Sequence, residues 1–395
     1  MKRRPDFDVV VVGTGAGGAA AAYYLGRAGL NVLVVEKARL PRYKACGGSI
    51  PSPTLDRFPF DFNNVIQAVP TEVRFTFPGL APVDIPLPDR PVVMVKRSEF
   101  DAFLLAHSEA EVLEGTPVTG VVEQKDRVQV EVGDRSITAR YLVGADGAAS
   151  LLARRLGLRQ GRRLGSALEA DVPLDGDRTL VGEYGNRAVF AMAVVSWGYA
   201  WVFPRGDHLS VGIARVRPGK TDLRAALQRE MDRLGICLDG VRLHGHPLPC
   251  YQSPPWPLWS GLALLFRARQ PQERLSTRRC LLVGDAAGLV DPLIGEGVRY
   301  AIVSARLAAK AIARDDLLGY EEAVWRDIGH GLATAGLVAN TYYRLPMLSY
   351  QIGVRNPVAL RQFVEVLTER KSYEGIGRRL VAATALWLWR GGPRA

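Results

Sequence analysis

The sequence predicts a mixed α/β fold, with a Rossmann-like dinucleotide-binding domain interleaved with an antiparallel-sheet domain and with helices at the C-terminus. Three segments far apart in the chain carry this prediction, because each reads as an apolar strand that ends in a glycine-bearing turn. They are residues 8–18, 141–150 and 280–297. Turns at the carboxyl ends of such strands are where α/β sheets bind ligands, so we expect all three turns to hold one cofactor.

The first segment has the spacing of a dinucleotide-binding turn. An apolar strand leads into Gly13-Thr14-Gly15-Ala16-Gly17-Gly18, and an alanine-rich helix is predicted to follow. In this G-x-G-x-x-G pattern Gly13 makes the turn, Gly15 leaves bare backbone for a pyrophosphate, and Gly18 lets the helix pack closely on the strand. The phosphate would lie at the helix N-terminus, near Ala16, where free N–H groups favour negative charge.

A second strand over residues 31–35 ends at Glu36 and Lys37, which we also place at the cofactor. The spacing of Glu36 from the turn is close to the roughly 20 residues expected of an acid that binds a ribose 2′-hydroxyl. A carboxylate there would repel a 2′-phosphate, so an NAD-like or FAD-like nucleotide is expected. A glycine-rich turn without a ligand is the alternative for a lone motif.

The other two turns carry acidic residues. One strand ends in Asp146-Gly147, and the last delivers Gly284-Asp285, followed by a loop with Pro292, Gly295 and Gly297 before a long predicted helix. With these motifs the chain resembles the FAD-dependent oxidoreductases of the para-hydroxybenzoate hydroxylase fold. Within them it looks most like the geranylgeranyl reductase family.

Six places carry the resemblance: the N-terminal turn, Tyr43 to Gly48, Arg97 to Asp101, Asp146-Gly147, Gly284 to Gly297, and Tyr199-Ala200-Trp201-Val202-Phe203-Pro204. They are interleaved along the chain, which implies a discontinuous FAD-binding domain of residues 1–70, 96–157 and 272–330. Residues 71–95 and 158–271 are then expected to form the substrate domain. Residues 331–395 would form a C-terminal helical region, with breaks at Pro346 and Pro357.

The resemblance also implies site residues. Cys46, Tyr199 and Trp201 are expected to be catalytic, and no metal site is expected. The expected FAD-binding residues are Gly13, Gly15, Ala16, Gly18, Glu36, Lys37, Cys46, Gly47, Arg97, Asp146, Gly284, Asp285, Pro292, Gly295 and Gly297. Three of these expectations have alternatives: Cys46 as a small buried residue in a tight loop, Arg97 as a solvated helix-start residue, and the aromatic stretch as plain sheet core.

The implied reaction is saturation of carbon–carbon double bonds in a prenyl chain, using FAD and an external reductant such as NAD(P)H or reduced ferredoxin. Aromatic hydroxylation is the alternative that the wider fold implies, and halogenation belongs to relatives with Trp-x-Trp-x-Ile-Pro in place of Tyr199 to Pro204. A flavoprotein that only carries or senses a lipid is a third class. Trp197, Tyr199, Trp201 and Phe203 alternate, so on a strand they would share one face.

Composition limits the partners. The net charge of +11 favours an anionic lipid surface or a diphosphate substrate, while the absence of a nucleic-acid motif argues against DNA or RNA; an arginine-rich but merely soluble chain is the alternative. Four cysteines without C-x-x-C spacing support no zinc or iron–sulfur site, and whether Cys237 and Cys250 pair cannot be read from the sequence. The chain is expected in the cytoplasm. The arginine-flanked apolar segment 378–390 is either a membrane-interface helix or a buried core helix.

Overall fold

The computed structural model describes residues 4–159, 163–252 and 273–389. The first of its sheets contains β1 (Phe7–Val12), β2 (Val32–Val35), β8 (Glu111–Leu113), β11 (Arg135–Gly144) and β17 (Cys280–Leu282) in parallel, with β9 (Val118–Glu123) and β10 (Val128–Val132) added antiparallel. Because β1, β11 and β17 are parallel neighbours, the three glycine-bearing turns that follow them lie at one edge of the sheet, as the sequence predicts.

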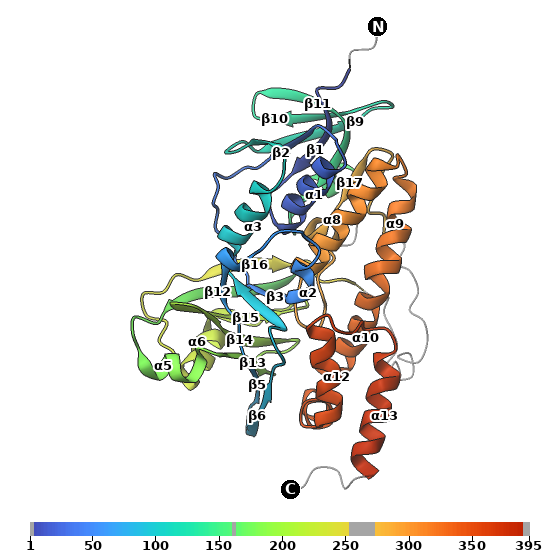
Figure 1. Ribbon diagram of the computed structural model, residues 1–395. Coiled ribbons are helices and arrows are strands. Elements are labelled where there is room, and N and C mark those ends of the chain that lie inside the picture. The colour runs from blue at the N-terminus through green and yellow to red at the C-terminus, as the bar shows by residue number, and fades with distance from the viewer. Residues whose placement is uncertain (1–3, 160–162, 253–272, 390–395) are drawn as a thin grey trace.

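Helices cover this sheet (Figure 1). Helix α1 (Ala16–Arg27) packs between α3 (Arg97–Ala106) and α8 (Val298–Ala313), and its alanines at positions 19–22 are fully buried. Short helices α4 (Leu151–Arg155) and α7 (Gly284–Ala287) follow the turns after β11 and β17. The small side chains of α1 allow the helix to approach the strands closely.

Two glycines make that approach possible. A Cβ on Gly18 would lie 1.8 Å from the carbonyl oxygen of Gly13, and one on Gly13, which has a φ of +98°, would lie 2.5 Å from the carbonyl oxygen of Ala145. No side chain fits at either distance, so both positions require glycine. The structure thus confirms that Gly13 makes the turn and that Gly18 permits the packing of helix on strand.

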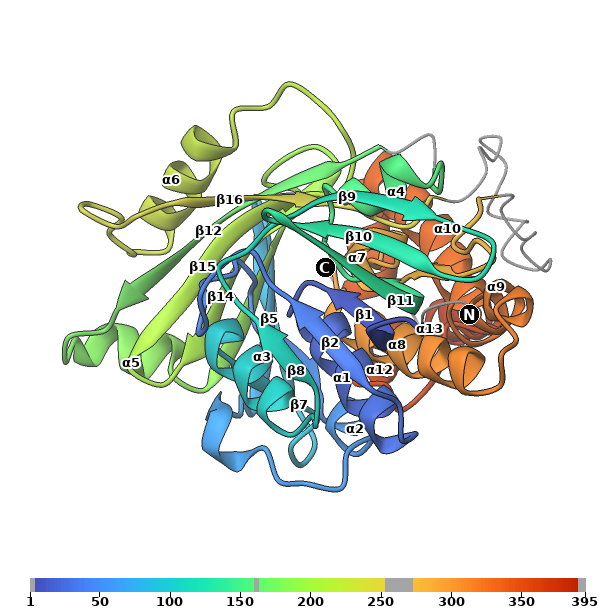
Figure 2. The ribbon, with the colours of Figure 1, turned by 90° about the horizontal axis from the view of Figure 1, so that it is seen from above.

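The second sheet has the order β16-β12-β15-β14-β13-β5-β6 and is mostly antiparallel. Its strands are β5 (Glu72–Phe77), β6 (Leu80–Pro86), β12 (Gly165–Pro173), β13 (Arg187–Met192), β14 (Gly198–Arg205), β15 (His208–Arg215) and β16 (His244–Leu248). Helices α5 (Arg178–Tyr184) and α6 (Leu223–Arg233) pack on one face, where Leu227 and Met231 are fully buried. Figure 2 shows this sheet curving beside the first one.

A three-stranded sheet lies where the two parts of the fold meet. Strand β7 (Val92–Val95) pairs with β3 (Ser49–Pro51) and β4 (Ile66–Ala68). Along the chain, α2 (Ser52–Leu55) and the 3₁₀ helix η1 (Asn63–Val65) connect β3 to β4. The end of segment 71–95, which we assigned to the substrate domain, therefore pairs with strands from segment 1–70, which we assigned to the FAD-binding domain. The domain division itself stays a proposal, with this sheet at the junction.

The C-terminal region is helical, as predicted. It contains α9 (Leu318–Val324), α10 (His330–Arg344), α11 (Pro346–Ser349), α12 (Pro357–Leu367) and α13 (Ile376–Trp389), with π-helical turns at η3 (Trp325–Gly329) and η4 (Tyr350–Val354). Pro346 and Pro357 each open a new helix, where a missing N–H is harmless. Tyr350 and Leu360 pack against β5 and its neighbours. Within the described part of the chain, no helix has the length and apolarity needed to span a membrane.

Candidate active site

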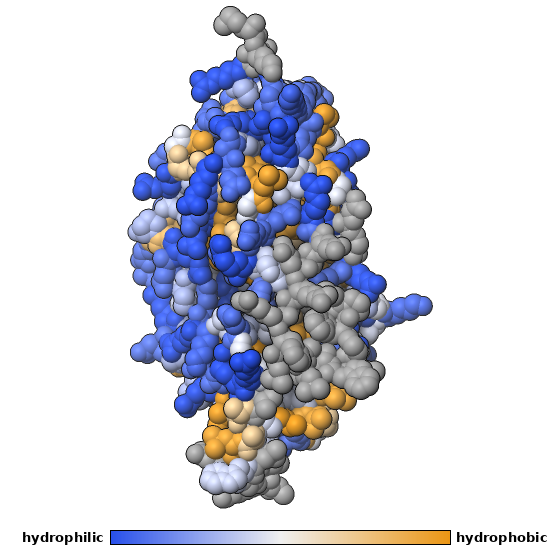
Figure 3. Space-filling view, turned by 90° about the vertical axis from the view of Figure 1, so that its right-hand side faces the viewer, coloured by the Kyte–Doolittle hydropathy of each residue, from blue (hydrophilic) through white to orange (hydrophobic). Residues whose placement is uncertain are grey.

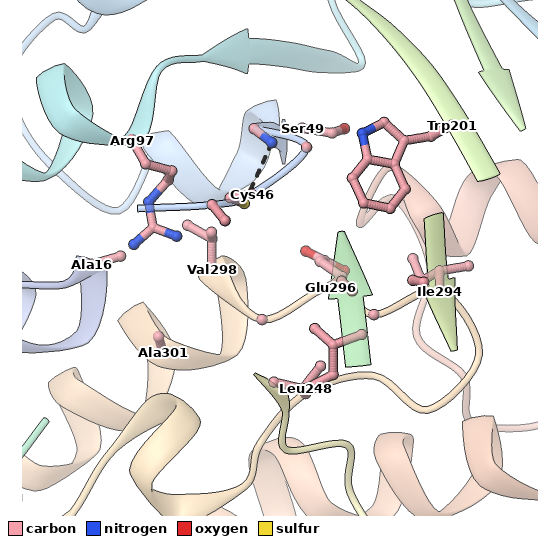
Figure 4. Close-up of a pocket in the computed structure, with 18 of the residues that line it drawn as sticks. Ala16, Cys46, Ser49, Arg97, Trp201, Leu248, Ile294, Glu296, Val298 and Ala301 are labelled. Carbon is pink, nitrogen blue, oxygen red and sulfur yellow. Dashed lines mark hydrogen bonds between the residues drawn. The ribbon is translucent and has the colours of Figure 1, made fainter. Parts of the chain in front are cut away.

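A cavity lies between the first sheet, the second sheet and α12 (Figure 4). It holds about 1640 Å³ of free space, its open mouth included. The three glycine-bearing turns, the loop at Cys46 and the aromatic face of β14 all contribute to its lining. Segments separated by some hundreds of residues along the chain therefore meet at one place.

At one end of the cavity, cationic side chains surround the start of α1. A Cβ on Gly15, the N-cap of α1, would lie 3.6 Å from Nη2 of Arg42, 3.7 Å from Nζ of Lys44 and 3.9 Å from Nη2 of Arg97. Three cations and a helix N-terminus around bare backbone form an anion site of the kind that binds a pyrophosphate. The residues present thus fit the diphosphate of a dinucleotide.

Arg97 is fixed in place. It is 5% exposed, and its Nε and Nη2 each donate to Asp101 at 2.9 Å. Arg42 also lies 3.5 Å from Asp101. The alternative that Arg97 is a solvated helix-start residue is therefore wrong: the buried carboxylate of Asp101 holds it at the cavity, one turn along α3.

Glu36 lies beside the turn, outside the cavity lining. Its carboxylate accepts hydrogen bonds from the backbone N–H and the hydroxyl of Thr14, at 2.9 and 2.6 Å, and from Nε of Arg42 at 3.3 Å. Burial acts to raise its pKa, but these bonds and the charge of Arg42 leave the pKa of Glu36 below its ordinary value. Glu36 is therefore a carboxylate that braces the turn, and its contact with a ribose stays a proposal.

Asp285 and the loop residues Gly295 and Gly297 also line the cavity. Asp285 is ion-paired with Lys44 at 3.2 Å and lies 3.8 Å from Nε2 of His246. Burial opposes ionisation, yet the charge of Lys44, aided by His246, holds the pKa of Asp285 far below its usual range. A permanent carboxylate in this position suits a role as acceptor for ribityl or ribose hydroxyls.

The loop itself is tied down by Asp291, a fully buried residue. Asp291 accepts from the backbone N–H of Leu293 at 2.7 Å and of Ile294 at 3.2 Å, and from the hydroxyl of Tyr373 at 2.8 Å. The C-terminal region thus holds the loop that carries Gly295 and Gly297. Gly297 is also the N-cap of α8, so the free N–H groups of that helix begin at the cavity.

The Cys46 loop is pressed between the two sheets. The N–H of Cys46 donates to Glu169 at 3.0 Å, and its carbonyl accepts from Nη2 of Arg205. A Cβ on Gly47 would lie 3.0 Å from the ring of Phe203, and Gly48 has a φ of +76°. Cys46 is partly buried and lines the cavity, so it is accessible to a ligand there.

The aromatic face of β14 is shorter than expected. Tyr199, Trp201 and Phe203 line the cavity, but Trp197 precedes the strand with a φ of +58° and packs instead on Tyr343 and under Arg217. The prediction of four aromatics on one face was wrong for Trp197. The strand begins only at Gly198, and outside a strand the alternate spacing of residues no longer sets which way a side chain points. The other three form a wall of the cavity, so they are more than sheet core.

The structure brings most of the predicted site residues to this cavity. Those in its lining are Gly15, Ala16, Cys46, Gly47, Arg97, Tyr199, Trp201, Gly284, Asp285, Gly295 and Gly297. Those outside it are Gly13, Gly18, Glu36, Lys37, Asp146 and Pro292. Gly13 and Gly18 shape the turn, Lys37 is exposed, and Asp146 accepts from the N–H of Leu152 at the start of α4. Gly13, Gly18 and Asp146 thus shape the backbone around the cavity.

Sequence reasoning missed several lining residues. Glu296 stands between two glycines that were predicted, and Glu169 lies with Asp171 in the otherwise mostly apolar strand β12. His244, His246 and Leu248 lie on β16, whose short sequence has no motif. Of the residues that the structure describes, none form a group of three His, Cys, Asp or Glu side chains suited to a metal ion. Cys46, Cys237, Cys250 and Cys280 are free, so Cys237 and Cys250 do not pair.

Comparison with known proteins agrees with this geometry. A model of the FAD binding domain matches residues 6–176. A geranylgeranyl diphosphate reductase from Rhodobacter capsulatus is 31% identical over 320 residues, which cover 77% of this chain and 74% of the relative. The chain belongs to the geranylgeranyl reductase family of FAD-dependent oxidoreductases.

A relative with another named activity and several solved structures are also similar to this chain. A menaquinone reductase from Mycolicibacterium smegmatis is 29% identical, and the matched region covers 90% of this chain and 88% of the relative. Among solved structures, a geranylgeranyl bacteriochlorophyll reductase-like protein from Thermoplasma acidophilum has a TM-score of 0.73 at 21% identity, covering 96% of both chains. A halogenase in complex with phloroglucinol and FAD has a TM-score of 0.63 at 18% identity, covering 95% of this chain and 85% of its own. These structures establish the fold.

Proposed function

We propose that this member of the family is an FAD-dependent reductase that saturates carbon–carbon double bonds of a prenyl chain in a lipid or isoprenoid substrate. The observation that carries the proposal is that one cavity is lined both by the cationic start of α1 and by many apolar side chains. The apolar lining includes Val73, Leu87, Val92, Met94, Phe190 and Leu367. A lining of this kind suits a hydrocarbon tail, because its burial is favourable by about 0.8 kcal/mol per CH₂ group.

FAD, when bound and reduced, supplies a hydride to the substrate. The residues around it bind and orient it: Arg42, Lys44 and Arg97 would hold the diphosphate, and Asp285 would accept from hydroxyl groups. The N–H groups at the start of α8, beside Gly295 and Gly297, would stabilise negative charge on the reduced ring.

The remaining lining residues act on the substrate. An isolated alkene has no electron-withdrawing group, so hydride and proton must arrive close together, with cationic character on the more substituted carbon. The ring faces of Tyr199 and Trp201 would stabilise such a charge by up to about 2 kcal/mol in a site that excludes water. The hydroxyl of Tyr199 donates to the carbonyl of Ile294, and burial holds the pKa of this tyrosine well above its ordinary value. Tyr199 is therefore a neutral wall residue, while Cys46 stays a candidate protic group.

The relatives' names favour this reaction over its alternatives. Geranylgeranyl diphosphate reductases and menaquinone reductases are among the relatives. The fold by itself does not discriminate, because it is shared with a halogenase. Against halogenation, this chain has Tyr199 and Phe203 where the halogenase stretch has tryptophan and isoleucine.

A second part of the proposal concerns the membrane. Exposed apolar side chains gather at the C-terminal end of the molecule, where α11 and α13 lie (Figure 3). They are Leu345, Met347, Leu348, Leu386 and Trp389, of which Trp389 is 82% exposed. Together with the +11 net charge they suit contact with an anionic lipid surface, from which a prenyl substrate would be drawn. Ala383 of α13 is buried, so this helix also packs on the protein.

The test of the reaction is anaerobic. Protein purified with FAD is reduced by dithionite and mixed with geranylgeranyl diphosphate, and flavin absorbance is followed. Reoxidation by this substrate, and none by its fully saturated analogue, is the expected result. A flavin that stays reduced in the presence of substrate until oxygen is admitted would favour the monooxygenase. If the substrate is turned over neither without oxygen nor with it, the result would favour a lipid carrier.

A further inference from the structure

The loop that carries Cys46 and the strand that carries Trp201 come from distant parts of the chain, and they pack directly on each other. A Cβ on Gly47 would lie 3.3 Å from Nε1 of Trp201. Both Cys46 and Trp201 line the cavity (Figure 4). The placement of the loop relative to the indole therefore sets the shape of the cavity at this point.

Strand β15 sets the orientation of the indole. Trp201 lies opposite Gly212 of β15, where a Cβ would overlap the ring. Two residues earlier, and thus on the same face of the strand, the hydroxyl of the fully buried Ser210 accepts from Nε1 of Trp201 at 3.2 Å. Gly212 leaves room for the ring and Ser210 binds its N–H group, so the indole is held in one orientation.

A single buried carboxylate connects the indole to the loop. Glu169 of β12 lines the cavity and is 2% exposed. Its Oε1 accepts from the hydroxyl of Ser210 at 3.2 Å. Its Oε2 accepts from the hydroxyl of Tyr43 at 2.7 Å and from the N–H of Cys46 at 3.0 Å. A chain of hydrogen bonds therefore runs from the indole through Ser210 and Glu169 to the backbone of Cys46.

Arg205 holds the other polar group of the Cys46 backbone. It is 3% exposed, its Nη2 donates to the carbonyl of Cys46, and it lies 3.4 Å from Glu169. Its Nη1 donates to Asp171 at 2.9 Å. A Cβ on Gly48 would lie 2.8 Å from Nη2, so the guanidinium lies against bare backbone of the loop. The N–H and the carbonyl of Cys46 are both bound, and the thiol is left at the cavity on a fixed backbone.

We propose that Glu169 is a positioning residue of the reductase, an assignment that rests on the proposed function. It fixes the thiol of Cys46, the candidate protic group, relative to the indole of Trp201, whose ring face would stabilise cationic character in the substrate. Both groups must meet one alkene at the same time, and a misplacement of about 1 Å can slow a reaction by about 10²-fold. The cations at the start of α1 hold the diphosphate of FAD, so binding of FAD does not require Glu169.

The first test compares Glu169→Gln with a matched control. Glutamine has the size of glutamate, but its NH₂ group would face either Arg205 or the donors of the Cys46 loop, so the chain of hydrogen bonds is broken on one side. In anaerobic single turnovers of FAD-loaded protein with geranylgeranyl diphosphate, flavin reoxidation should slow by about 10²-fold while FAD affinity is unchanged. The control is Glu230→Gln. Glu230 is a buried glutamate of α6 that is paired with Arg233 away from the cavity, and this variant should react at the wild-type rate.

The second readout does not depend on turnover. Iodoacetamide labelling of the FAD-loaded protein is quantified at each cysteine by peptide mass spectrometry. Loss of the bond to its N–H frees the loop, so Cys46 should be labelled faster in Glu169→Gln than in the wild type. Cys280 is fully buried in the first sheet, and its labelling reports general opening of the fold, so it should stay at the wild-type level.

A third measurement tests the connection to the indole. Ser210→Ala removes the bond to Nε1 of Trp201, so it should slow flavin reoxidation in the wild-type background. In a Trp201→Phe background there is no indole N–H to hold, and the same change should have no further effect. Equal slowing in both backgrounds would overturn the proposed action through the indole.

The outcomes separate the assignment from the function. A wild-type rate of reoxidation, or wild-type labelling of Cys46, in Glu169→Gln would overturn the positioning role and leave the reductase function intact. Absence of reoxidation by substrate in the wild type would instead refute the function, and the labelling would then decide alone whether Glu169 holds the loop. Should Glu169→Gln fail to fold, Tyr43→Phe takes its place, since Tyr43 is 45% exposed. Faster labelling of Cys46 in that variant would support the assignment, and unchanged labelling would overturn it.

Discussion

Gly15→Val should abolish FAD binding without unfolding the chain. Gly15 has ordinary extended backbone angles, φ −62° and ψ 173°, and the atoms nearest to a Cβ there are the ends of Arg42, Lys44 and Arg97, at 3.6 to 3.9 Å. A valine therefore fits the protein but occupies the space in which a pyrophosphate would approach the backbone. The structure predicts a folded, colourless protein.

The magnitude follows from linkage. FAD at 100 times its dissociation constant stabilises the wild type by about 2.7 kcal/mol. The unfolding entropy is about 2.1 cal/mol/K per residue, so for a chain of 395 residues the total unfolding entropy is about 0.8 kcal/mol/K. Dividing the stabilisation by this entropy gives a rise in the melting temperature of about 3 °C. Gly15→Val should show no such rise, and its melting temperature without FAD should match that of the wild-type apoprotein.

Two variants on the same helix complete the experiment. Gly26→Ala adds a Cβ 3.6 Å from Glu109, which is ordinary contact, so it should keep both FAD and stability. Gly18→Val places a Cβ 1.8 Å from the carbonyl of Gly13, which forces strand and helix apart and should cost about 1–3 kcal/mol or more even without FAD. If Gly15→Val purified fully yellow, or melted as early as Gly18→Val, the reading of the turn as a pyrophosphate site would be wrong.

Three further predictions concern the surroundings of the site. Tyr373→Phe leaves the buried Asp291 without one hydrogen bond and should lower the free energy of unfolding by about 1–3 kcal/mol in urea titrations, whereas an unchanged midpoint would mean that the bond does not hold the loop. The pKa of Glu36 is lower in the folded protein than in the unfolded chain, so its contribution to stability is present above the unfolded pKa of about 4.3 and is lost as pH falls through the lower folded value. In Glu36→Gln the melting temperature should therefore fall less steeply with decreasing pH than in the wild type. An identical pH dependence in the two proteins would count against this contribution of Glu36. Truncation after Gly377 should weaken binding to anionic liposomes while FAD content is retained; precipitation or loss of FAD would make α13 a core helix and end the membrane proposal.

The sequence could predict the parts of the site that depend on backbone geometry. Gly13 and Gly18 could be recognised because their spacing in the first turn reflects close approaches that only glycine allows. In the loop before α8, Gly295 has a φ of +70°, which also favours glycine. Glu169 and Glu296 escaped because neither acid belongs to a motif whose spacing has a known meaning. Their roles depend on tertiary contacts, Glu169 with Tyr43 and Cys46, and Glu296 with Arg299. Trp197 was misplaced for a related reason, since alternation does not reveal where a strand begins.

Mass spectrometry of the reaction product tests the central claim most directly. Dithionite-reduced, FAD-loaded protein is incubated with geranylgeranyl diphosphate in the strict absence of oxygen, and the lipid is extracted. We predict products heavier by two hydrogens for each double bond reduced, with no oxygen incorporated. A product that forms only when oxygen is present, and that carries a hydroxyl group, would contradict the account.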